Sequence, residues 1–173
     1  DPGNLRFLDS IIIKGSVKIP EGFTKYYLGL KKDQVYNEGK YRGLNYEIEK
    51  SGIFQMPRPP QFLFEKEMTS MFLYMEKKPV NRISGIAGIN TNDDGSVFFT
   101  GNLDLSLNHV FNAAESFELK WSSPRAGSQQ LNINLDVPYL FKSPVGIVGN
   151  FDLYREDTLF SNRTALIGLS LNP

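Results

Sequence analysis

The sequence predicts an α+β module of the order βααββ, followed by an antiparallel β-meander. Two observations carry this prediction. Apolar residues at the three- and four-residue spacing of a helix occur only before Pro79. From Arg82 onward apolar and polar residues alternate, most strictly over residues 131–137, as in a strand with two different faces. We therefore expect one domain over residues 8–79 and a second over residues 81–173.

Composition limits the class of protein. The 173 residues are 40% hydrophobic and 13% aromatic, which is enough for a packed core. Lys plus Arg and Asp plus Glu both number 19, and there is no basic stripe, so we expect no nucleic-acid partner. The absence of cysteine excludes disulfides and thiolate metal sites. No apolar run reaches the roughly 18 residues of a membrane-spanning helix, and no signal peptide is visible, so we expect a soluble chain or one whose signal was removed.

The first strand and the first helix are predicted on either side of Pro20. Residues 8–18 contain three adjacent isoleucines, and this β-branched run predicts a buried strand. Proline is tolerated at the first position of a helix. The apolar residues after it have helical spacing, so we expect a short helix that is interrupted near Gly29. Its apolar positions are Phe23, Tyr26, Tyr27 and Leu30.

A second helix is predicted after Asn37, whose side chain can cap the helix N-terminus. Tyr41, Leu44 and Ile48 form a stripe along one face of this helix. Gly52 stands where a C-terminal cap is expected. The helix therefore has both a start signal and a stop signal.

Two further strands complete the first domain. Prolines between Phe54 and Pro60 exclude a central strand there. Residues 62–64 and 71–75 are strand-like and are joined by a polar turn. With the first strand they predict a small three-stranded sheet that is backed by the two helices.

Six strands are predicted after Pro79. The first runs from Arg82 to Asn90 and is weakened by glycine, and residues 92–95 (Asn-Asp-Asp-Gly) predict a hairpin turn after it. The other five cover residues 97–110, 116–122, 130–137, 147–153 and 164–172. One face of the central strands is apolar and carries Leu103, Leu105, Leu107, Phe117, Leu119, Trp121, Leu131, Ile133, Leu135 and Val137.

This alternation has two interpretations. A soluble sheet covers a core with its apolar face, whereas the wall of an outer-membrane barrel turns that face to lipid and its polar face to a wet lumen. The well-defined strands have about nine to eleven residues, the length that crosses a bilayer at a tilt. Aromatic residues gather near strand ends, as an interfacial girdle or as the packing of a soluble core. They are Phe98, Phe99, Phe111, Trp121, Tyr139, Phe141, Tyr154 and Phe160. We expect the barrel wall.

Five short stretches carry a resemblance to a known family. They are Ile12–Gly15, Tyr36–Glu38, Thr69–Lys77, the NHVFN of residues 108–112 and the VPYLF of residues 137–141. Residues 8–78 resemble a POTRA (polypeptide-transport-associated) domain. Residues 81–173 resemble the start of the barrel of the BamA and TamA outer-membrane insertases, the bacterial surface antigen family. The resemblance covers nearly the whole chain and lies in the order and spacing of loose motifs.

The resemblance implies a last POTRA domain in the periplasm and the first six strands of a barrel of about sixteen in the bacterial outer membrane. We therefore expect a fragment, which lacks the arginine-bearing loop motif of the later barrel. The implied function is to fold and insert β-barrel proteins without ATP, by strand templating at a lateral gate. The implied partners are unfolded outer-membrane protein clients, other outer-membrane assembly subunits and the lipid bilayer, and a truncated fragment can form a homo-oligomer.

The lateral gate is expected at the first barrel strand. In the family this strand meets the last one at a weak contact that opens sideways, and an unpaired edge is a template for another chain. The alternative is that Gly85 and Gly88 only relieve crowding where the sheet bends. We hypothesise that a client strand pairs with Ile83, Ser84, Gly85, Ile86, Ala87, Gly88, Ile89 and Asn90.

A second pairing site is expected at the edge of the POTRA-like sheet. In this topology the middle strand in sequence lies at the edge, where it can add a client or accessory strand. The strand comprises Phe62, Leu63, Phe64 and Glu65. The alternative is an edge that is merely guarded by charge and by the prolines before it.

No catalytic, metal or cofactor site is predicted, and we expect no enzyme. His109 is the only histidine, and we interpret it as a strand-end residue. Residues 93–95 lack the distal glutamate of a calcium loop. A glycosidase needs a carboxylate pair, but lumen-facing polar residues are the simpler account of Asp104, Glu118, Asp136 and Asp152.

Two other functions stay open from the sequence. A translocator of the same superfamily secretes a partner through its lumen. A soluble β-rich carbohydrate-binding module behind an adaptor domain belongs to a different class. Such a module is monodisperse in plain buffer, whereas a barrel fragment aggregates or oligomerises to cover its leucines.

Overall fold

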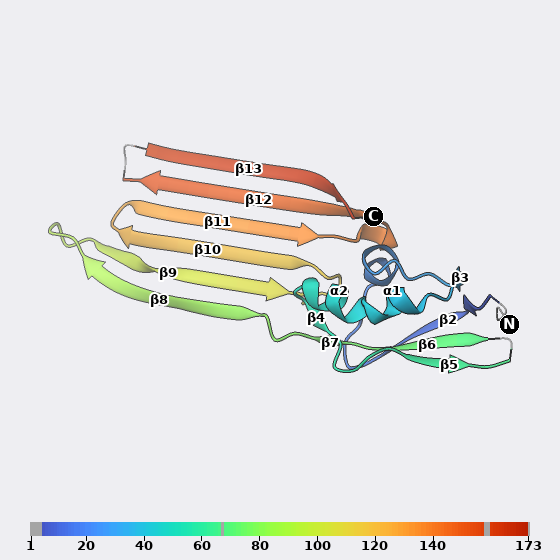
Figure 1. Cartoon of the computed structure of the whole chain (residues 1–173). Helices are drawn as coiled ribbons and strands as arrows, with labels where there is room; N and C mark the ends of the chain where they lie inside the picture. The colour runs from blue at the N-terminus through green and yellow to red at the C-terminus, as the bar shows by residue number, and fades with distance from the viewer. Residues whose placement is uncertain (1–4, 67, 158–159, 173) are drawn as a thin grey trace.

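The computed structural model describes residues 5–66, 68–157 and 160–172. An N-terminal part, residues 5–80, is followed by a six-stranded antiparallel sheet that extends away from it in one direction (Figure 1). We call this sheet, formed by β8 to β13, the large sheet.

The N-terminal part is built on a three-stranded sheet of β2 (Ser10–Lys14), β6 (Thr69–Tyr74) and β5 (Gln61–Phe64). β6 lies in the centre, parallel to β2 and antiparallel to β5. The predicted first strand was too long: the pairing of β2 with β6 ends at Lys14, and Gly15 follows with a positive φ of 140°. Two short pairs flank the sheet: β1 (Phe7–Leu8) with β3 (Gln34–Val35), and β4 (Phe54–Gln55) with β7 (Glu76–Lys77).

The helices are shorter than predicted. The expected first helix is one π-helical turn, η1 (Phe23–Tyr27), because Gly29 soon takes a left-handed φ of 59° that no α-helix continues. The expected second helix is two pieces, α1 (Glu38–Arg42) and α2 (Leu44–Lys50), which meet at Gly43. The predicted βααββ module is thus present in its strands but not in two full helices. Among the described residues, no helix has the length and apolar character to cross a membrane.

The predicted caps of the second helix are confirmed. The side chain of Asn37 accepts a hydrogen bond from the backbone N–H of Lys40 at 3.0 Å. Gly52 follows the last helical turn with a φ of 74°, the left-handed conformation that glycine adopts without strain. Local sequence signals therefore set both ends of this helical segment correctly.

The predicted six-stranded meander is confirmed, with each strand paired to its neighbours in sequence. β9 ends before the predicted Val110 because His109 has a left-handed φ of 51°. The strands are β8 (Arg82–Thr91), β9 (Val97–Asn108), β10 (Ser116–Arg125), β11 (Ser128–Val137), β12 (Val145–Glu156) and β13 (Phe160–Leu171). A 3-10 turn, η2 (Leu140–Lys142), connects β11 to β12.

The hydrophobic core of the described chain lies in the N-terminal part. No strand of the large sheet supplies a fully buried hydrophobic side chain. The core cluster is Leu8, Phe23, Leu28, Leu30, Tyr41, Leu44, Ile48, Phe54, Met56, Met71, Leu73, Met75 and, from the turn between β9 and β10, Ala114.

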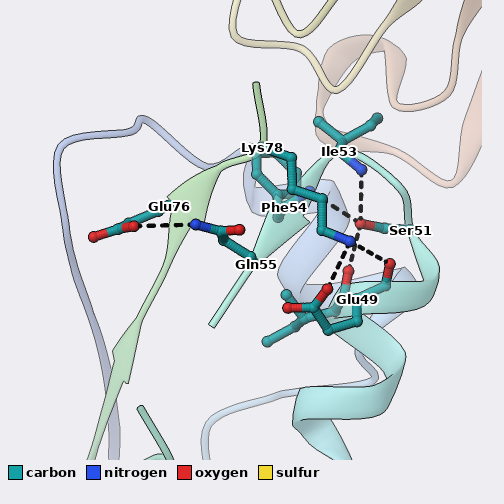
Figure 2. Close-up of polar contacts among 8 residues, drawn as sticks. Glu49, Ser51, Ile53, Phe54, Gln55, Glu76 and Lys78 are labelled. Carbon is teal, nitrogen blue, oxygen red and sulfur yellow. Dashed lines mark hydrogen bonds and ion pairs between the residues drawn. The ribbon is translucent and has the colours of Figure 1, made fainter. Parts of the chain in front are cut away.

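The segment just before β8 is fixed to α2 (Figure 2). Lys78 Nζ donates to the carbonyl of Glu49 at 3.0 Å and pairs with its carboxylate at 2.6 Å. The backbone N–H of Lys78 donates to the carbonyl of Ile53 at 2.8 Å. Gln55 donates to Glu76 at 3.3 Å beside the β4–β7 pairing. β8 therefore starts from a fixed point on the N-terminal part.

Two turns of the large sheet dock on the N-terminal part. In the β11–β12 turn, Tyr139 packs against the core cluster, and its ring occupies the space beside Gly22 that a Cβ would need. Burial raises the pKa of Tyr139 to about 12. Lys142 of the same turn pairs with Glu21 at 3.0 Å. The contact fixes one end of the large sheet against the N-terminal part.

The β9–β10 turn makes the second contact, through His109. Its ring packs edge-on against Phe54 with 4.7 Å between the centroids, and Lys77 Nζ donates to its carbonyl at 3.1 Å. The Nδ1 atom accepts the N–H of Ala114 at 3.1 Å, which fixes Nδ1 as unprotonated. The Nε2 atom is buried and has no hydrogen-bond partner among the described residues. His109 is therefore held neutral.

The electrostatics of this turn agree with a neutral ring. Burial lowers the pKa of His109, the charge of Glu115 opposes that effect, and the charge of Lys77 adds to it. Burial also acts to raise the pKa of Glu115, but the N–H groups that its carboxylate accepts, those of Phe111 at 2.6 Å and Ala113 at 2.9 Å, hold it below the usual range. The turn therefore contains an ionised, well-bonded carboxylate and an uncharged imidazole.

We predict that mild acid loosens this contact. The folded state binds fewer protons than the unfolded state, whose histidine pKa is about 6.5, so stability rises with pH in the window below that value. The stabilisation is complete above about pH 6.5 and is lost as the pH falls through the folded pKa. Thermal unfolding between about pH 7.5 and pH 5.5 measures this loss of stability. The free energy of unfolding should fall by roughly 1.4 kcal/mol for each pH unit that separates the folded and unfolded pKa values.

The control is His109→Asn, because asparagine tolerates the left-handed φ of this position. The variant should unfold at a temperature that is nearly constant over the same pH window. An unchanged pH slope in the variant contradicts the assignment to His109.

Candidate functional site

Cross-strand register builds one continuous apolar face on the large sheet. Residues directly opposite each other in paired antiparallel strands point to the same side. In the central row, Ile83 lies opposite Leu105, and Leu105 lies opposite Leu119. The same row continues to the far edge through Ile133, Phe151 and Ala165. The structure places every residue that was predicted to face lipid on this apolar face.

Nothing in the described chain covers the apolar face. Toward the two edges, Ile83 is 73% exposed and Ile167 is 82% exposed. In the middle, the apolar side chains are half-buried or exposed, and none is fully buried. A sandwich or a sheet that covers a soluble core would bury these central positions first. The sheet is therefore a single layer.

The opposite face is mainly polar, although Ile86, Val148 and Leu166 are also exposed on it, and it carries its own hydrogen-bond network. Asn132 donates to Asp152 at 2.6 Å, Asn134 donates to Asn132 at 2.7 Å, and Asn150 donates to Asn134 at 2.9 Å. Asp104 lies in the same row as Asp152, but Lys120 and Asn132 stand between them. The carboxylates considered for a glycosidase pair are thus part of a mixed polar surface. Within the described ranges, no group of histidine and acidic residues is placed to hold a metal ion.

The predicted aromatic girdle needs correction. Phe98 lies opposite Asn90, Tyr154 lies opposite Gln130, and Phe160 lies opposite Glu156, so these rings are on the polar face. Tyr139 packs on the N-terminal part. The reason is that closeness to a strand end does not decide the face; the phase of the alternation does. On the apolar face the aromatic residues are Phe99, Phe117, Trp121 and Phe151.

The residues proposed for the lateral gate all lie in β8, at one edge of the large sheet. β13 forms the other edge. Ser84 shares the polar face with Asp104, and Ala87 shares the apolar face with Gly101. The outer side of β8 is unpaired within the described chain, so its backbone groups are available to another strand.

The glycines of β8 have a packing role toward β9. A Cβ on Gly85 would lie 2.6 Å from the carbonyl oxygen of Asn102. Across the ladder, Gly101 has a φ of 147° and faces the carbonyl of Ile86 with no room for a side chain. These glycines permit a close β8–β9 approach. A gate at β8 therefore depends on the edge position of the strand rather than on Gly85.

The second predicted pairing site, Phe62 to Phe64, lies in β5 at the edge of the small sheet, and Glu65 follows it. An open groove of about 580 Å³ lies beside this edge. Tyr36 and Tyr41 line it, and the ring of each packs against that of Phe62 with 5.2 Å between the centroids. The groove was not anticipated from the sequence. The proline-rich residues 57–60 form one wall of the groove, and they are the feature of the sequence that could have indicated it.

We predict that Gly101→Ala weakens the β8–β9 pairing, because alanine is strained at this φ and meets the Ile86 carbonyl. The expected loss is about 1–3 kcal/mol, measured by urea unfolding and by faster hydrogen exchange of β8 amides. The matched control is Gly149→Ala in β12, where a Cβ meets only the Cβ of Leu135 at 3.9 Å. Equal effects of the two substitutions would contradict the close approach.

Comparison with known proteins identifies similar structures but no sequence family. No family model and no curated protein matches the sequence. The crystal structure of BamA from Haemophilus ducreyi lacking POTRA domains 1–3 aligns with a TM-score of 0.64 at 12% identity, over 98% of this chain and 32% of that one. CdiB from Acinetobacter baumannii aligns with a TM-score of 0.55 at 16% identity, over 96% of this chain and 34% of that one.

These comparisons concern the fold. The chain spans about a third of the length of each of the two structures. The likeness covers both the N-terminal part and the large sheet, since nearly the whole chain aligns. The fold of this chain is therefore that of a segment of these larger structures.

Proposed function

We propose that the chain is part of an outer-membrane β-barrel, in which the large sheet is a portion of the wall. One observation carries the proposal: the apolar face is continuous across six strands and uncovered, while the opposite face holds a hydrogen-bonded amide and carboxylate network. Soluble monomers rarely expose apolar patches larger than a few hundred Å². In a barrel wall each face meets its own solvent, lipid outside and water inside.

The dimensions of the apolar face fit a bilayer. On β12 it extends from Val145 to Leu153, which is about 26 Å along an extended strand. The lipid-facing band of a barrel is about 25 Å tall. A soluble carbohydrate-binding module has no need of such a band on an uncovered face.

We further propose that the N-terminal part is a POTRA domain on the periplasmic side of the membrane. The order β2-β6-β5, with the strand that is second in sequence at the edge, is the arrangement that the resemblance implies. The described contacts to the large sheet are made at one end of it, by the turns that contain His109 and Tyr139. The helices of the N-terminal part are shorter than the resemblance implies, and in this respect the chain departs from a POTRA domain.

The proposed activity is insertion of outer-membrane proteins, with β8 as the strand that pairs with a client and other assembly subunits as partners. The unpaired edge of β8, anchored through Lys78 to α2, supports this. A fixed base and a free edge are what a strand template requires. A secretion pore of the same superfamily is the second candidate, favoured by the hydrogen-bonded amides of Asn132, Asn134 and Asn150, a polar lining suited to a chain in transit.

The membrane assignment predicts opposite tolerance on the two faces. Ile133→Lys places a charge on the apolar face at the central row, and we expect it to destabilise the intact protein in phospholipid vesicles by about 2–4 kcal/mol. Asn134→Lys, the next residue and on the polar face, is the matched control and should cost much less. Guanidinium unfolding in vesicles measures both. Similar losses for both variants contradict a lipid-facing surface.

The gate assignment is tested by crosslinking in the intact protein during client folding. A photoreactive residue at Ser84 or Ala87 should form adducts with a client strand. The controls are Ser106 and Leu119 in β9 and β10, which are paired on both sides and should give none. Absence of a client adduct at both β8 positions removes the gate, and adducts of a secreted substrate at Asn150 instead support the pore.

A further inference from the structure

The apolar face of the large sheet carries two charged side chains in the described strands, and both are arginines. Arg155 follows Leu153 in the apolar series of β12, and Arg163 precedes Ala165 in that of β13. Every other strand position on this face is apolar, glycine or uncharged polar. The acidic residues of the regular strands lie on the polar face. The charge on the apolar face is therefore of one sign and confined to one place.

The register brings the two arginines together. Arg155 lies opposite Ser161, and Arg163 lies opposite Leu153, so the arginines are diagonal neighbours, with roughly 7–8 Å between their backbones. Both are exposed. Arg155 Nε donates a hydrogen bond to the backbone carbonyl of Asp157, at the long distance of 3.4 Å. Gln129 lies opposite Arg155 on β11 and adds an amide donor.

No carboxylate of the described strands compensates these two charges on their own face. Asp152 and Glu156 are nearby in β12 but point to the polar face, where Asp152 accepts from Asn132 and Glu156 pairs with Arg125. Two like charges that are diagonal neighbours repel each other. The arrangement is stabilised when an anion lies between the two guanidinium groups.

The position along the strands is equally specific. β12 ends and β13 begins at the end of the large sheet that is far from the N-terminal part (Figure 1), and Arg155 and Arg163 lie close to these strand ends. The apolar series of Ile147, Phe151 and Leu153 leads up to them on β12. Cations thus stand where an apolar band ends, which is where a lipid has its head group.

We propose that Arg155 and Arg163 bind the phosphate of a lipid head group in the membrane leaflet that is distant from the N-terminal part. The inference rests on the proposed function, because it takes the apolar face to be in lipid. Paired guanidinium groups suit a phosphate, which each can hold through two parallel N–H donors. The acyl chains of the same molecule lie along Leu153, Phe151 and Ile167. This continuity with the apolar face selects a phosphorylated lipid over a free phosphate ion.

The test uses the intact protein in phosphatidylcholine vesicles with and without diphosphorylated lipid A. After extraction in a non-ionic detergent, mass spectrometry measures the lipid A that stays bound to each protein molecule, and inorganic pyrophosphate at equal concentration is the competitor. We expect R155Q/R163Q to bind lipid A roughly thirtyfold more weakly. R155K/R163K should keep most of the binding, because the charge is retained. Arg82→Gln, on the polar face of β8, is the matched control and should bind as the parent does.

The outcomes separate this inference from the proposed function. Insertion of R155Q/R163Q into vesicles, scored by protease protection, should equal that of the parent protein while lipid A is lost. Undiminished lipid A binding by R155Q/R163Q overturns the site. Displacement of lipid A by equimolar pyrophosphate overturns the choice of a lipid. Failure of the parent protein to insert into any vesicle overturns the proposed function and the inference with it.

Discussion

The structure depends on one constraint: six strands keep a period-two alternation in register, so that the residues of each row across the large sheet share one face, mainly apolar on one side and mainly polar on the other. The row of Ile83 and Ile133 is apolar from edge to edge, and the row of Asp104 and Asp152 is polar. A slip of one residue in any strand would mix the two faces. Because the described chain covers neither face, the register decides which solvent each side meets, and the proposed site in the membrane depends on it.

The N-terminal part provides what the large sheet lacks, namely a buried core and a fixed frame. The sheet is held to this frame at one end only, through Phe54 against His109, through Tyr139 and through the Lys78–Glu49 pair before β8. Its edges and its far end are left free in the described chain. Edge pairing and lipid contact, the two proposed roles, both use these free surfaces, so stability and function are divided between the two parts.

Interpretation of single residues succeeded where the cause was local and failed where it was not. Asn37 and Gly52 were predicted as caps, and the structure confirms them, because capping depends on neighbours in sequence. The girdle was wrong at Phe98, Tyr154 and Phe160 because the face of a residue is set by strand phase and pairing. Two interpretations of Gly85 stayed open from the sequence, a weak gate strand or relief of crowding, and its geometry is set by the β9 backbone on the inner side.

The sequence by itself determined the meander, the apolar identity of its central face and the edge position proposed for β8, because alternation and turn signals are encoded within a few residues. It did not determine the helical segment after Pro20, where Gly29 and packing leave one π-helical turn. Only the tertiary structure decided that the apolar face is uncovered and that Arg155 and Arg163 are neighbours on it. Coverage and proximity are relations between strands distant in sequence, and no local pattern contains them.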